Sequence, residues 1–125
     1  MDQHDLVHRY LHAMQRGAAG GEDELVALFA EDGEYIESFN GSSTSHHGRQ
    51  AIRTWLRASW ADRPPDIQLA IEHITVNGEH VEATWRCESS SFAKPSYGVD
   101  RYTIRHGLIV RLETVVTTPP VIVDH

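Results

Sequence analysis

The chain has 125 residues and a formal net charge of −7 at pH 7, with 11 Lys and Arg against 18 Asp and Glu. A chain of this length can bury a hydrophobic core without disulfide or metal cross-links, so we expect a single domain over residues 1–125. The acidic balance argues against a nucleic acid or an anionic membrane as partner and favours a small neutral or hydrophobic ligand. The lone Cys87 excludes an internal disulfide, and no apolar run reaches the ~20 residues of a membrane span, which favours a cytoplasmic location.

Helical periodicity marks three segments in the first half of the chain, near residues 2–16, 22–30 and 49–61. In the first segment, Tyr10 lies at the centre of the apolar arc. A buried tyrosine hydroxyl needs a partner, so either the core supplies an acceptor or Tyr10 presents its hydroxyl to a cavity. The third segment carries a basic row at i, i+4 spacing, which we interpret as a solvated or partner-facing edge rather than an anion site: Arg49, Arg53 and Arg57.

Histidines recur one turn apart on the first helix, at His4, His8 and His12. This spacing would allow a metal site on one face of the helix. The row lies on the polar side, however, and no carboxylate completes a ligand set. We therefore predict a solvated face, with no metal and no other cofactor.

Residues 34–39 alternate as a strand, with Tyr35, Glu37 and Phe39 on one face. Aromatic neighbours raise the pKa of a carboxyl toward neutrality, which suits Glu37 to act as a general base. The alternative is a short edge strand that leaves Glu37 in water.

A polar segment over residues 40–47, rich in Ser and Thr, is predicted to be a loop. It ends in His46 and His47, directly before the third helix. Loops of this kind carry function, so both imidazoles are candidates for acid–base work at the rim of a pocket.

From residue 67 onward the pattern is that of strands. Asn77-Gly78 is a strong hairpin signal, and the apolar face changes near Glu72-His73, which predicts a bulge and a curved sheet. A second turn is expected at His106-Gly107. The expected strands are residues 67–76, 80–90, 97–105 and 108–117.

Asp100 does not fit the pattern of its strand. It shares the inward face with Tyr102, whereas the residues that alternate with them are polar. An ionised, unpaired carboxyl in an apolar site is costly, so Asp100 must find hydrogen-bond partners or hold its proton. The alternative is a structural role, in which Asp100 caps a turn or pairs with Arg101 or Arg86.

Three motifs resemble the nuclear transport factor 2-like superfamily: Leu28-Phe29-Ala30-Glu31-Asp32, His47-Gly48-Arg49-Gln50-Ala51-Ile52, and Val99-Asp100-Arg101-Tyr102 with Gly107-Leu108-Ile109. Within it, the chain resembles the SnoaL-like and ketosteroid-isomerase-like branch. The resemblance implies an α+β, cystatin-like cone, in which a curved antiparallel sheet wraps three N-terminal helices around an internal pocket. The same cone hosts isomerases, polyketide cyclases, dehydratases, hydrolases and proteins with no known chemistry.

The resemblance to ketosteroid isomerase also implies site residues. Tyr10, in Arg9-Tyr10, matches a tyrosine that donates to the substrate oxyanion. Glu37 lies eight residues after Phe29, where that family places its general base, although the family's base is Asp. Asp100 matches its second oxyanion donor, a protonated Asp. The remaining pocket residues are expected to be Tyr35, Phe39, His46, His47, Trp55, Trp85 and Tyr102.

These features predict a cofactor-free proton-transfer enzyme, an isomerase, polyketide cyclase or lyase, that acts on a small hydrophobic carbonyl compound. In that mechanism, Asp100 is neutral at pH 7, and Glu37 is ionised with its pKa shifted upward. Two alternatives stay open: water activation by Asp100 for epoxide or ester hydrolysis, and a non-catalytic ligand-binding or dimerisation module. Polar residues on the outer sheet face predict a homodimer through that face.

Overall fold

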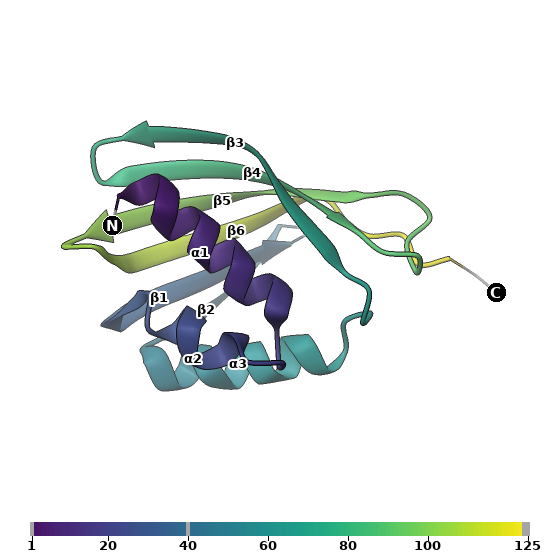
Figure 1. Cartoon of the computed structure of the whole chain (residues 1–125), viewed down its shortest axis with the longest axis horizontal. Coiled ribbons are helices and arrows are strands. Elements are labelled where there is room, and N and C mark those ends of the chain that lie inside the picture. Colours follow the sequence, from purple (N-terminus) through teal and green to yellow (C-terminus); the bar gives the residue numbers. More distant parts are fainter. Residues whose placement is uncertain (1, 40, 124–125) are drawn as a thin grey trace.

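The computed structural model describes residues 2–39 and 41–123, apart from the side chain of Phe39. The helices are α1 (Gln3–Arg16), α2 (Gly21–Val26) and α3 (Arg49–Ala61). The strands are β1 (Phe29–Phe39), β2 (Ser42–His47), β3 (Gln68–Asn77), β4 (His80–Glu88), β5 (Ser96–Arg105) and β6 (Leu108–Thr118). All six strands form one sheet in the order β2-β1-β6-β5-β4-β3, which curls over the helices (Figure 1). The expected α+β cone is confirmed.

The sheet is antiparallel, as expected, except where β1 meets β6. These two strands run parallel, with Glu37 opposite Thr114. A parallel pair needs a long crossover, and here the whole stretch from β2 to β5 supplies it. The last strand of the chain therefore lies in the middle of the sheet.

Helix α1 follows its predicted pattern. The side chain of Asp2 caps its N-terminus by accepting a hydrogen bond from the Asp5 backbone N–H at 2.8 Å. Gly17, with φ +58°, ends the helix. The buried arc packs against the sheet and includes Leu6, Val7, Tyr10 and Ala13. None of the helices in the described part of the chain is long and apolar enough to cross a membrane.

Helix α2 is shorter than the sequence predicts. It ends at Val26, and β1 begins at Phe29, which pairs with Ile109 of β6. The backbone N–H of Ile109 donates to the carbonyl of Leu28 at 2.8 Å. Gly33 lies within β1, where the strand register shifts. Pairing with a distant strand has overridden a local helical pattern.

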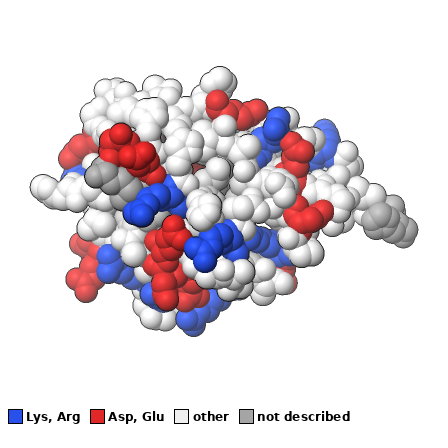
Figure 2. All heavy atoms as spheres, viewed as in Figure 1, with Lys and Arg blue, Asp and Glu red and all other residues white. Residues whose placement is uncertain are grey.

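The basic row of α3 binds other parts of this chain. The side chain of Arg57 is 65% exposed, as expected for a solvated edge, whereas Arg49 and Arg53 are half-buried. Arg53 donates to Glu22 at 2.7 Å, and Arg57 donates to the same carboxylate at 2.6 Å. Arg49 donates to the backbone carbonyl of Phe29 at 2.7 Å. Figure 2 shows acidic and basic side chains gathered together on the helical side of the molecule. These contacts fix α2 and the start of β1 against α3.

The predicted loop over residues 42–47 is wrong, because these residues form β2 and pair with β1. Its side chains are mostly exposed, so this edge strand has no apolar face that a sequence pattern could reveal.

The predicted bulge in β3 is confirmed by a register shift between Ile71 and His73. The turn at His106-Gly107 is also as expected, since both residues have positive φ, 53° and 75°, as a tight hairpin turn requires.

Candidate active site

A cavity of about 250 Å³ lies between the helices and the inner face of the sheet. This volume is just below the range of about 300–1,000 Å³ that holds drug-sized ligands, so the cavity suits a small molecule. Its wall is mostly apolar, and all three tryptophans of the chain contribute to it: Trp55, Trp60 and Trp85.

Asp100 lies on the wall of this cavity and is only 4% exposed. Its Oδ1 accepts hydrogen bonds from Trp85 Nε1 at 3.1 Å and from Thr114 Oγ1 at 2.8 Å. Its Oδ2 accepts a hydrogen bond from the Tyr102 hydroxyl at 3.2 Å. Asp100 therefore points inward, as predicted, and three side chains of this chain satisfy it.

The structural alternatives for Asp100 are wrong. It lies in the interior of β5 and caps no turn there. Of the two arginines considered as partners, Arg101 pairs with Glu113 at 3.6 Å and Arg86 pairs with Glu88 at 2.7 Å.

Glu37, Thr114 and Asp100 form one row across the sheet. Glu37 of β1 is opposite Thr114 of β6, which in turn is opposite Asp100 of β5, and all three line the cavity. Neighbouring strands are about 4.8 Å apart, so the backbones of the two acidic residues are separated by about 10 Å. Two carboxyl groups thus face one small cavity from either side of a threonine.

Gly98 allows Trp85 to reach Asp100. The two residues are opposite each other on β5 and β4, and a Cβ atom at Gly98 would lie 2.1 Å from Cζ2 of Trp85. The indole ring therefore lies directly over the backbone of Gly98. A glycine inside a strand often marks such a close approach.

Burial raises the pKa of Asp100 to about 6, although the hydrogen bonds from Thr114, Trp85 and Tyr102 oppose this shift. The direction agrees with the sequence-based expectation. A pKa of about 6 lies below the value that would keep the carboxyl neutral at pH 7 and favours the ionised form there. Asp100 is therefore mainly an ionised acceptor of hydrogen bonds and not a neutral donor.

Tyr10 and Tyr35 bring hydroxyl groups to the cavity. Burial raises the pKa of each well above its ordinary value, and the nearby charge of Asp100 adds to the rise. A side-chain hydrogen bond with Thr114 opposes the rise for Tyr35. Both phenols keep their protons at neutral pH and can donate them in hydrogen bonds.

Tyr102 contributes to the site differently from the sequence-based expectation. It is 2% exposed and is not among the residues that line the cavity. Its hydroxyl donates to Asp100, and its ring meets that of Tyr10 edge-on, with the centroids 5.8 Å apart. Tyr102 therefore holds Asp100 in place.

Trp55 and Tyr35 stack with their ring centroids 4.0 Å apart, and both line the cavity as predicted. The ring of His46 lies 5.8 Å from that of Trp55, outside the lining residues. His47, the next residue of β2, is exposed and lies opposite Glu34 of β1 in the strand register. Successive strand residues face opposite sides, so the prediction of a pocket role for His47 is wrong. Phe39, the last predicted pocket residue, has its side chain outside the described residues.

Four polar lining residues were missed as site residues: Ser59, Arg63, Cys87 and Thr114. Alternation along β6 could have found Thr114, because it lies between the inward positions 112 and 116. Burial raises the pKa of the Cys87 thiol to about 11, so it stays protonated at neutral pH. No sequence pattern distinguishes Arg63.

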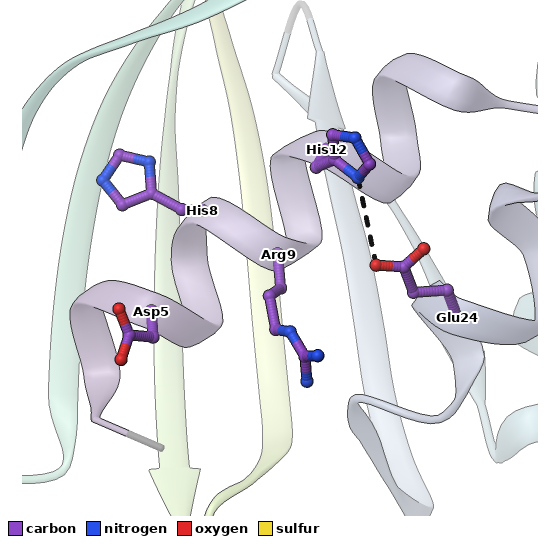
Figure 3. Close-up of a pocket in the computed structure, with 5 residues that line it drawn as sticks. All are labelled: Asp5, His8, Arg9, His12 and Glu24. Atoms are coloured by element: carbon purple, nitrogen blue, oxygen red, sulfur yellow. Dashed lines mark ion pairs between the residues drawn. The ribbon is translucent and has the colours of Figure 1, made fainter.

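A second, open hollow lies on the outside of α1, where the histidine row was considered as a metal site (Figure 3). His12 Nδ1 lies 3.9 Å from Glu24 Oε1, whereas His8 points away from this pair. Within residues 2–39 and 41–123, no three His, Cys, Asp or Glu side chains are arranged to hold a metal ion.

Comparison with solved structures gives the fold. A proposed ketosteroid isomerase from Kribbella flavida has a TM-score of 0.72 at 18% identity, covering 97% of this chain and 82% of that one. A proposed polyketide cyclase from Sinorhizobium meliloti has a TM-score of 0.69 at 24% identity, covering 88% and 93%. An uncharacterised cystatin-fold protein from Novosphingobium aromaticivorans has a TM-score of 0.72 at 18% identity, covering 91% and 97%.

These identities are too low to transfer an activity, and a search of curated proteins found no match. The family itself is clear, because a model of the SnoaL-like domain matches residues 7–112. The chain therefore belongs to the SnoaL-like domain family.

Proposed function

We propose that the protein is a cofactor-free enzyme that moves a proton next to the carbonyl group of a small hydrophobic compound. The observation that carries this proposal is Asp100, a buried carboxylate on the cavity wall whose pKa is raised to about 6. A general base works best when its pKa lies near the working pH. Membership of the SnoaL-like family is compatible with isomerase and cyclase chemistry but selects neither.

Asp100 can accept a proton without losing its partners. An ionised carboxylate offers about four lone-pair positions, and the bonds from Trp85, Thr114 and Tyr102 occupy three of them. One position on Oδ2 remains for the proton of a substrate C–H group. We therefore assign the base role to Asp100, whereas the sequence-based mechanism gave it to Glu37.

In this mechanism, Tyr10 stabilises the enolate. When Asp100 removes a proton beside a carbonyl group, negative charge develops on the carbonyl oxygen, and the Tyr10 hydroxyl on the same cavity wall can donate to it. Glu37 faces the substrate from the other side of Thr114. In an isomerisation, protonated Asp100 returns its proton to a second carbon of the enolate. In a lyase reaction, Glu37 in its protonated form gives a proton to the leaving hydroxyl group, which departs as water.

The test is proton exchange of small ketones in D₂O, followed by NMR, in the wild type and in isosteric variants. Asp100→Asn is expected to reduce the exchange rate by about 10²–10⁴-fold, the usual contribution of a general base. Glu37→Gln is expected to have a smaller effect, and the reverse order would return the base role to Glu37. Glu113→Gln is the matched control, because Glu113 precedes Thr114 in β6 and pairs with Arg101 away from the cavity.

The pH profile gives a second readout. Only ionised Asp100 can act as a base, so kcat/KM should rise with pH and level off above about pH 6. The Asp100→Asn variant should lose this inflection. A rate that falls as pH rises through 6 would show that Asp100 acts in its protonated form.

A non-catalytic ligand-binding module is the second candidate, because the chain's own donors already satisfy most of the hydrogen-bonding capacity of Asp100. In that case phenols, which resemble an enolate, would bind in the cavity. No carbonyl compound would exchange its protons. This combination would replace the enzymatic proposal by the binding one.

A further inference from the structure

Arg63 follows α3 and lines the cavity, half-buried. Its Nη1 donates to the backbone carbonyl of Met14 at 2.6 Å, and its Nη2 donates to that of Gln15 at 2.8 Å. The guanidinium carbon also lies 5.8 Å from the ring centre of Trp60. These contacts hold the cation at the end of α1, where carbonyl groups have no partner within the helix.

No carboxylate of the described residues lies within ion-pair distance of Arg63. A guanidinium has five N–H donors, so two hydrogen bonds leave three for another acceptor. Partial burial lowers the pKa of Arg63, which reflects the cost of removing its charge from water. An anion bound here would offset that cost and could form charge-assisted hydrogen bonds.

We propose that the cavity binds a small carboxylic acid, with the ligand's carboxylate on Arg63 and its apolar body extending toward Asp100. This names the substrate class of the reaction proposed above and rests on that proposal for the reacting end. An apolar wall with one cation at one end is the lining that an aryl or alkyl acid requires.

The sheet register fixes the orientation of the ligand. Arg63 and Cys87 line the same cavity, and Cys87 comes four residues after Ala83, the cross-strand partner of Asp100. At about 3.3 Å per residue, Ala83 and Cys87 are about 13 Å apart along β4. Asp100 and Glu37 share the far row, where their charges would repel the ligand's carboxylate. The reacting carbonyl group of the acid must therefore lie several bonds away from its carboxylate.

The experiment is a binding titration read by tryptophan fluorescence, because every tryptophan of the chain lines the cavity. The probes are 3-phenylpropanoate and its uncharged isostere 3-phenylpropanamide, at pH 7.5 and low salt. The wild type should bind the acid at least about ten-fold more tightly than the amide, as expected for a charge-assisted contact. Arg63→Gln should remove this difference and leave the affinity for the amide unchanged.

Arg57→Gln is the matched control, because Arg57 belongs to the adjoining helix and pairs with Glu22 outside the cavity. This variant should keep the full preference for the acid. The proposal is overturned if the wild type binds the two probes equally or binds neither, or if the preference survives in Arg63→Gln.

If Arg63→Gln does not fold, salt decides on the wild type alone. Added salt should weaken binding of the acid but not of the amide, and a salt-independent preference would overturn the proposal. Because the readout is binding, the Asp100→Asn variant should keep the preference for the acid even if it loses proton exchange. Failure of the reaction and failure of this inference are thus separate results.

Discussion

Asp100→Asn should stabilise the protein at neutral pH. Asparagine has nearly the shape of aspartate, and its Oδ1 can accept the hydrogen bonds of Trp85 and Thr114. Its Nδ2 would face the Tyr102 hydroxyl, which can rotate to accept a hydrogen bond. Trp85 and Thr114 keep their acceptor, whereas the O–H of Tyr102 loses the one that Asp100 Oδ2 provides. The main change is that residue 100 can no longer ionise.

The magnitude follows from the shift in pKa. The pKa of Asp100 rises from 3.8 to about 6 in the folded protein, and each unit corresponds to about 1.4 kcal/mol, which gives about 3 kcal/mol. The folded state holds the proton more tightly than the unfolded chain does. The stabilising contribution is therefore complete below about pH 3.8 and is lost as pH rises through about 6. Asn does not titrate, so its contribution to the free energy of unfolding stays constant over this pH range.

Urea unfolding of both proteins, followed by circular dichroism between pH 4 and pH 8, measures this difference. We expect the variant to be more stable by about 3 kcal/mol at pH 7, with the difference falling to about 0.6 kcal/mol at pH 4. Parallel pH profiles would refute the reasoning, because they would mean that Asp100 has an ordinary pKa. A variant that is less stable at pH 7 would mean that hydrogen bonds to the ionised carboxylate outweigh its burial.

Three further predictions follow from other parts of the structure. Gly98→Ala should displace Trp85 and reduce the free energy of unfolding by about 1–3 kcal/mol, measured by urea unfolding, whereas an unchanged stability would show that the indole ring can move freely. Cys87 should react with iodoacetamide at pH 8 more slowly than free cysteine, because burial raises its pKa to about 11, and equal rates would contradict this. We also propose a homodimer through the sheet face opposite the cavity, where Arg101 and Glu113 lie 3.6 Å apart. Sedimentation at micromolar concentration should show the dimer, and a monomer alone would exclude it.

The fold was predictable wherever the pattern is local. Helices α1 and α3 and the four C-terminal strands each carry their own period of apolar residues. The exceptions depend on distant partners. The helical pattern around Phe29 gives way to pairing with Ile109, which lies 80 residues further along the chain. Strand β2 is a polar edge strand whose only partner is β1, so its sequence resembles that of a loop.

The candidate site divides in a similar way. Asp100 was predictable because it interrupts an apolar alternation, and Tyr10 because it lies on an apolar arc. Thr114 fits either face of a strand, and the position of Arg63 depends on how the chain turns after α3. The pKa of Asp100 was the hardest property to predict, because it depends on burial and on donors from two neighbouring strands, Trp85 of β4 and Thr114 of β6.

The parallel pairing of β1 with β6 has a consequence for how the protein folds. β1 and β2 can form a hairpin early, but they join the rest of the sheet only through β6, which is the last strand to be synthesised. Closing so long a loop is slow, and until it closes the two edges that will meet stay open to other chains. Glu37 belongs to β1 and lies opposite Thr114, so the cavity acquires its second carboxyl group only in this step. We therefore expect stability, solubility and a functional cavity to appear together in folding.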